Sequence, residues 1–152
     1  MEGQAIPCDQ ILQRLNHVLV EGVTVLSVYE DGAKIKNLAY LDCSVTLEYD
    51  NGISDRDTLQ IEKLFYSPQI LVEKKGKNGI QEQDIAPMIR RLTVKKTDSH
   101  TLVLEARICC QNPTLNPAQL SVAVAKYLPD LAPSFTKCAR LEIYDTNEIS
   151  FR

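Results

Sequence analysis

Apolar and polar residues alternate most clearly in two stretches of the chain. The first covers residues 41–49, where every second residue is apolar: Leu41, Cys43, Val45, Leu47 and Tyr49. The second covers residues 101–110, with the same alternation at Leu102, Leu104, Ala106, Ile108 and Cys110. A period of two predicts a half-buried β-strand that turns one face to the core and the other to solvent.

Three further segments repeat their apolar residues at intervals of three and four, which is typical of amphipathic helices. Helices are predicted near residues 9–19, 55–65 and 117–128. Each is preceded by a capping signal. Asp9 is the expected cap of the first helix, Ser54 and Asp57 have the spacing of a capping box for the second, and Asn116 precedes a proline at the third.

Shorter apolar runs between turn residues predict the remaining strands, at residues 23–29, 69–75, 80–83, 91–97 and 138–144. The turn Gly76–Gly79 contains Asn-Gly, a dipeptide that readily adopts positive φ, so it joins two of these strands into a hairpin. From Leu41 onward the order is therefore strand, helix, strand, hairpin insert, strand, helix, strand.

This order predicts an α+β fold with a ferredoxin-like βαββαβ core, an antiparallel sheet and two helices on one face, plus the β-hairpin insert. Residues 38–152 are expected to form this domain. Residues 1–37, with their leading helix and strand, have no partner inside it and are expected to be the tail of a preceding unit.

Charge is unevenly distributed along the chain. The 152 residues carry a net charge of −3, whereas residues 74–96 hold seven lysines or arginines and two acids, a local excess of +5. The excess indicates a surface for an anionic partner, formed by Lys74, Lys75, Lys77 and Arg90. An equally weighted interpretation is a solvated hairpin edge that its lysines protect against aggregation. Asp84 and Pro87 are expected to shape the turn that presents these cations.

The residue types exclude several chemistries. Five cysteines without framework spacing favour reduced thiols, and neither His17 nor His100 has a partner at the spacing of a triad or a metal site. A catalytic Asp84 would need burial or a second carboxylate, but its neighbours are basic, so a capping role is preferred. We therefore expect no metal or cofactor, and no catalytic constellation is visible.

The chain also lacks a secretory signal and an apolar run of membrane length, which predicts a cytoplasmic protein.

Three segments resemble one known family: ILQRLNHVLVEGVTVLSV (residues 11–28), KKGKNGIQEQDIAPMIRRL (residues 74–92) and QNPTLNPAQLSVAV (residues 111–124). They are similar to the uncharacterised bacterial radical-SAM-linked protein, which is encoded beside, or fused to, a B12-binding-type radical SAM protein. Val20, Ala86 and Asn116 depart from the family pattern. The resemblance covers only the C-terminal part of the family, so its histidine-bearing N-terminal motifs are missing.

The resemblance implies a non-catalytic accessory or substrate-presenting domain that works with a radical SAM protein. An alternative is an RNA-binding module, because ferredoxin-like units commonly bind RNA on the sheet face. Against RNA stand the net charge of −3 and the lack of an RNP-type aromatic signature in residues 41–49. An independent enzyme ranks last.

Overall fold

The computed structural model describes residues 5–77 and 79–151. The chain separates into two compact units at Lys34, near the expected boundary between residues 37 and 38. The described part of the first unit is residues 5–34, and the second unit covers residues 35–151. Among the described residues, no helix has the length and apolar character needed to cross a membrane.

The first unit contains the helix α1 (Cys8–Val18). The prediction of a helix is confirmed, but Asp9 does not cap it. Pro7 is the N-cap residue, and no side chain makes a capping hydrogen bond there. Asp9 lies instead in the first turn, where its negative charge interacts favourably with the helix dipole. No residue of α1 is buried.

The predicted strand at residues 23–29 is wrong, because this segment forms no strand. A strand needs a neighbour to pair its backbone groups, and residues 5–34 include none. One residue of the segment is paired by a side chain instead. The Asn16 amide accepts a hydrogen bond from the Val25 N–H at 2.7 Å and donates one to the Val25 carbonyl at 3.0 Å.

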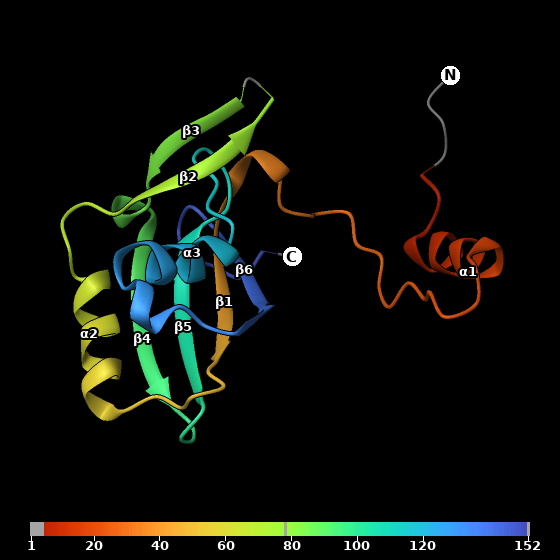
Figure 1. The fold of residues 1–152 in the computed structure, drawn as a ribbon. Helices are drawn as coiled ribbons and strands as arrows, with labels where there is room; N and C mark the ends of the chain where they lie inside the picture. Colours follow the sequence, from red (N-terminus) through yellow and green to blue (C-terminus); the bar gives the residue numbers. More distant parts are fainter. Residues whose placement is uncertain (1–4, 78, 152) are drawn as a thin grey trace. The chain divides into compact units, whose positions relative to one another are not determined.

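The second unit is built on a four-stranded sheet. Its strands are β1 (Leu38–Glu48), β4 (Ile89–Lys96), β5 (Thr101–Cys109) and β6 (Phe135–Asp145). They lie in the order β4-β5-β1-β6, and every neighbouring pair is antiparallel (Figure 1). The expected α+β fold with an antiparallel sheet is confirmed.

Two helices, α2 (Asp55–Phe65) and α3 (Ala118–Tyr127), pack on one face of this sheet (Figure 1). The predicted capping box of α2 is present, since the Ser54 hydroxyl accepts the Asp57 N–H and the Asp57 carboxylate accepts the Ser54 N–H. At α3 the Asn116 side chain accepts the Ala118 N–H at 3.0 Å. Short 3₁₀ helices occupy Ile35–Asn37, Ala86–Met88 and Pro129–Leu131.

The core lies between the helices and the apolar side of the sheet. The alternating residues that predicted strands β1 and β5 are buried, with the exception of the half-buried Cys110. From α2 and α3 the core receives Ile61, Leu64, Leu120, Ala123 and Val124. Cys43 is a free thiol that is 1% exposed, and burial raises its pKa to about 11. It therefore behaves as a small apolar residue.

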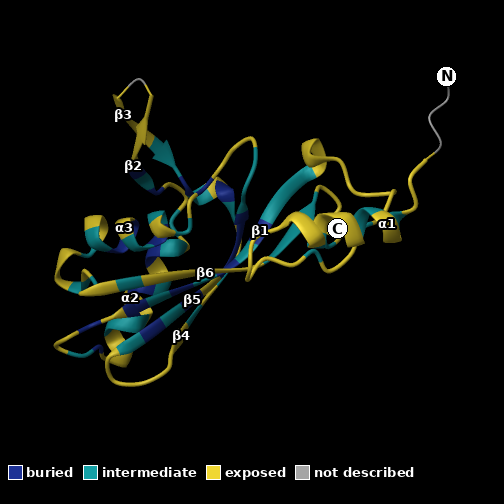
Figure 2. Cartoon of the chain, turned by 90° about the vertical axis from the view of Figure 1, so that its right-hand side faces the viewer, coloured by how far each residue is buried: buried dark blue, intermediate teal, exposed yellow. Residues whose placement is uncertain are grey.

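The inserted hairpin is a separate two-stranded sheet of β2 (Leu71–Gly76) and β3 (Gly79–Asp84). Most of its residues are exposed (Figure 2). It is anchored at its base, where Val72 is fully buried and the Ile85 N–H donates to the Ile70 carbonyl at 2.9 Å. The rest of the hairpin therefore presents side chains to solvent.

Candidate binding site on the cationic hairpin

The cationic hairpin, defined by Lys74, Lys75 and Lys77, carries its three lysines on β2 and the turn that follows. All three are exposed. Successive residues of a strand point to opposite faces, so Lys74 shares the face of the buried Val72 while Lys75 points the other way. Among the described residues, the one hydrogen bond of the Lys74 side chain is a long one of 3.4 Å from its Nζ to the Thr114 carbonyl. Two cationic groups thus stand on opposite faces of one strand.

An open hollow of about 370 Å³ lies between this hairpin and the start of α3. Its lining residues are Glu73, Lys74, Lys75, Gln83, Asn116 and Gln119. Two lysines, three amide residues and one acid border the hollow, and of the two lysines it is Lys74 that shares the face of Val72 and Gln83. Ammonium and amide N–H groups are donors to phosphate or carboxylate oxygens. The hollow therefore suits an anionic group.

Gln119 adds an unsatisfied polar atom to the hollow. Its side-chain oxygen is buried, and it has no hydrogen-bond partner among the described residues. The N-terminus of α3 begins one residue earlier at Ala118, and its dipole favours negative charge nearby.

Asp84 and Pro87 shape the turn between the hairpin and β4. The Asp84 carboxylate accepts two backbone N–H groups through Oδ1, from Ile70 at 2.9 Å and from Ala86 at 3.1 Å. Pro87 lies within the 3₁₀ helix Ala86–Met88, where its fixed φ suits a first turn. Asp84 therefore joins the entry and the exit of the hairpin.

Arg90 is one of two predicted binding residues that do not line the hollow. Its guanidinium donates to the Glu148 carboxylate at 3.3 Å and lies 5.2 Å from the centre of the Tyr40 ring. The structure thus brings Lys74 and Lys75 together at one hollow and leaves Arg90 in a different set of contacts. Lys77 lies in the turn, also outside the hollow.

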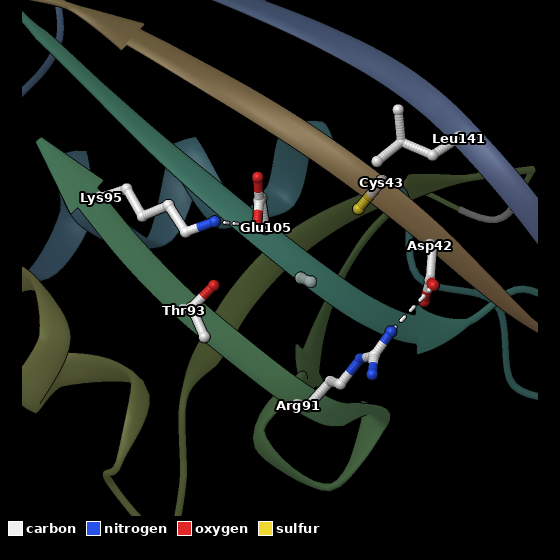
Figure 3. Close-up of a pocket in the computed structure, with 8 residues that line it drawn as sticks. Asp42, Cys43, Arg91, Thr93, Lys95, Glu105 and Leu141 are labelled. Atoms are coloured by element: carbon white, nitrogen blue, oxygen red, sulfur yellow. Dashed lines mark hydrogen bonds and ion pairs between the residues drawn. The ribbon is translucent and has the colours of Figure 1, made fainter. Parts of the chain in front are cut away.

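Arg90 adjoins an arginine cluster that sequence reasoning missed. Arg107 on β5 is 9% exposed and binds Asp42 on β1 with two nitrogens, at 2.7 and 2.9 Å. Arg91 donates to the same carboxylate at 2.9 Å (Figure 3), and the Arg107 guanidinium lies 3.9 Å from the Tyr144 ring centre. The hydrogen bond from Arg107 holds the pKa of Asp42 below its usual value. Because Asp42 and Arg107 occupy the polar phases of two predicted strands, only the register, which pairs them directly, identifies the cluster.

The structure adds no evidence for a metal centre. Within residues 5–77 and 79–151, no group of three or more His, Cys, Asp or Glu side chains is placed to hold a metal ion. His100 lies at an exposed hairpin turn, where its Nδ1 is 2.8 Å from the Ser99 hydroxyl.

Comparison with protein families identifies the chain in part. A family model described as "Uncharacterized protein conserved in bacteria (DUF2344)" matches residues 1–117. The chain belongs to this family. The match includes α1, the cationic hairpin and the Asp84–Pro87 turn, and it ends just before α3. No curated protein and no solved structure matches the chain. The expected link to a radical SAM protein remains a prediction.

Proposed function

We propose that this member of the DUF2344 family is a non-catalytic accessory domain that holds a macromolecular partner through the cationic hairpin. The observation that carries the proposal is the hollow of about 370 Å³, lined by Lys74, Lys75 and three amide side chains beside one carboxylate. An anionic group of the partner is the chemistry that these donors recognise. The hairpin reaches into solvent, so a large partner has access to it.

A B12-binding-type radical SAM protein in the cytoplasm is the partner that the sequence resemblance supports. The three segments that carry the resemblance include residues 74–92, which hold the cationic hairpin. In this proposal the domain docks on the enzyme or presents its substrate, and the partner supplies the radical chemistry. An acidic surface patch on that enzyme is the expected counterpart of the lysines.

RNA is the second candidate partner, and the exposed lysines are the observation that favours it. Their ammonium groups make no ion pair with any carboxylate in the described part of the chain. Phosphate oxygens bind such groups with release of counterions, which makes affinity strongly dependent on salt. The proposal of an RNA partner also includes a ferredoxin-like topology for the second unit. The strand order β4-β5-β1-β6, with α2 and α3 on one face, supports that class.

Co-purification tests the proposed function and separates the two partners. The tagged chain is expressed together with the radical SAM protein of the same genome, and the complex is isolated with and without ribonuclease treatment. We expect the enzyme to be retained in both samples. Loss of the bound material only after ribonuclease treatment identifies RNA, and no retained partner in either sample contradicts both candidates.

A charge-matched pair of variants assigns the interaction to the hairpin. In the test variant Lys74, Lys75 and Lys77 become alanine. In the control, three exposed lysines elsewhere, Lys34, Lys63 and Lys137, become alanine, which changes the net charge equally. We expect only the test variant to weaken partner binding. With RNA, the slope of log affinity against log salt concentration falls by about 2–3. Equal weakening in both variants shows a general charge effect instead.

A further inference from the structure

The free edge of β4 offers a second interaction surface, independent of the cationic hairpin. β4 pairs only with β5, so it forms one edge of the four-stranded sheet (Figure 1). The Thr97 N–H donates to Thr101 in β5, and antiparallel residues alternate in direction. Thr93 and Lys95 therefore turn their backbone groups toward β5, whereas those of Leu92, Val94 and Lys96 point to the free edge.

A hollow of about 200 Å³ lies beside this edge, between α2 and β4. Its lining residues are Glu62, Phe65, Tyr66, Ile89, Arg90, Arg91 and Leu92. Whole small-molecule ligands use pockets of about 300–1,000 Å³, so this hollow fits side chains of a larger partner. On α2, Leu59 and Tyr66 are 55% and 76% exposed and lie two helical turns apart on the same side as Glu62.

Charge restricts the partner that this edge accepts. β4 carries four cations, Arg90, Arg91, Lys95 and Lys96, and no acid. Lys95 and Lys96 are paired with Glu105 and Asp55 of the same unit, at 2.7 and 2.8 Å. The exposed guanidinium groups of Arg90 and Arg91 oppose pairing with a second copy of the same strand and favour an acidic one. The side chains of Arg90 and Arg91 are 52% and 64% exposed, and each uses one nitrogen to bind a carboxylate. The remaining guanidinium N–H groups make no further hydrogen bond within the described residues.

We propose that β4 and the adjacent α2–β4 hollow bind an extended acidic peptide segment of a partner protein, which adds to the sheet as a fifth strand. The outward backbone groups of Leu92 and Val94 pair with the peptide backbone, in the manner of β-strand addition. Apolar side chains of the peptide enter the hollow beside Phe65 and Tyr66. Its acidic side chains lie near Arg90 and Arg91.

Amide hydrogen exchange measured by NMR tests this pairing residue by residue. The probe is an acetylated hexapeptide of alternating valine and glutamate. In the free protein we expect the amides of Leu92 and Val94 to exchange fast and those of Thr93 and Lys95 to exchange slowly. We expect saturating probe to slow Leu92 and Val94 at least tenfold and to leave Thr93 and Lys95 unchanged. The matching valine–lysine hexapeptide should bind at least tenfold more weakly.

Two variants separate the groove from nonspecific contact. Tyr66→Ala removes the exposed wall of the hollow and should weaken binding of the valine–glutamate probe at least fivefold. Ile80→Ala removes an equally accessible apolar side chain (62% exposed) on the hairpin and should leave binding unchanged. No slowing at Leu92 and Val94 with millimolar probe overturns the proposal. Slowing confined to the β2–β3 hairpin, or displacement of the probe by an oligouridylate, overturns it equally.

Discussion

The hairpin and the sheet both carry clustered cations, but they use them differently. On the sheet Arg90, Arg91 and Arg107 each bind a carboxylate of the same unit. On the hairpin Lys74, Lys75 and Lys77 take part in no ion pair among the described residues. Among the sheet cations it is the buried Arg107 whose charge contributes to folding, whereas the exposed lysines of the hairpin remain available for a partner.

Burial explains this difference. The Arg107 side chain is 10% exposed and its partner Asp42 is 16% exposed, so neither charge tolerates the loss of the other. The lysines stand in water, where a charge needs no partner. Substitutions in the two regions should therefore act on different quantities, stability in the sheet and binding in the hairpin.

The largest expected effect comes from breaking the pair at the centre of the sheet. Asp42→Asn removes the closer of the two carboxylates that pair with the buried Arg107 guanidinium, leaving only Glu148 at 3.3 Å, and should lower the free energy of unfolding by about 3 kcal/mol. Urea denaturation measures the change. The control is Glu105→Gln, whose pair with Lys95 is 2.7 Å long but exposed on both sides, with an expected loss below about 1 kcal/mol. Equal losses in both variants would show that burial does not distinguish these pairs.

Lowering the pH should remove the same contribution of the Asp42–Arg107 pair to the free energy of unfolding. The hydrogen bond from Arg107 lowers the pKa of folded Asp42 below its usual value. A lowered folded pKa gives stabilisation that is complete above the unfolded pKa and is lost as pH falls through the folded pKa. The stability gap between wild type and Asp42→Asn should be constant from about pH 7 to 5 and shrink below about pH 4. Urea titrations across this range measure it, and a gap independent of pH would contradict the assignment.

How much was predictable from sequence depends on whether a feature is local or set by register. The alternation in residues 41–49 and the capping box at Ser54 are local signals, and the structure confirms both. Residues 23–29 have the composition of a strand, but pairing depends on a neighbour that composition does not supply. The Asp42–Arg107 pair joins residues 65 positions apart, and only the antiparallel register brings them together.

The same distinction, between local features and features that depend on distant parts of the chain, applies to the candidate site. The lysines and the predicted turn lie in one segment, so the hairpin was predictable from sequence alone, although residue 78 of the Asn-Gly pair lies outside the described residues. The hollow also needs Asn116 and Gln119, which reach it only because α3 begins beside the hairpin. Arg90 follows the hairpin closely in sequence, yet its contacts are with Tyr40 and Glu148. The closeness of Arg90 to the hairpin in sequence therefore did not predict which residues it contacts.

A smaller loss of stability is expected at the turn that separates the two regions. Asp84→Ala removes the acceptor of the Ile70 and Ala86 N–H groups and should cost about 1–2 kcal/mol. Asp84→Asn keeps an oxygen acceptor and should recover most of that loss. Thermal denaturation of the two variants measures the difference. If both variants lose the same amount, the charge of Asp84 matters more than its two hydrogen bonds.

The smallest effect on stability is expected on the cationic hairpin itself. Replacing Lys74, Lys75 and Lys77 with alanine should change the free energy of unfolding by less than about 0.5 kcal/mol for each residue, because exposed charges without partners contribute little. The loss in the free energy of unfolding should then be smaller than that of Asp42→Asn, although Asp42→Asn changes one residue and the hairpin variant changes three. Urea denaturation of the triple variant checks this. A loss near 3 kcal/mol would show that the lysines stabilise the fold and would remove the ground for treating the hairpin as a binding surface.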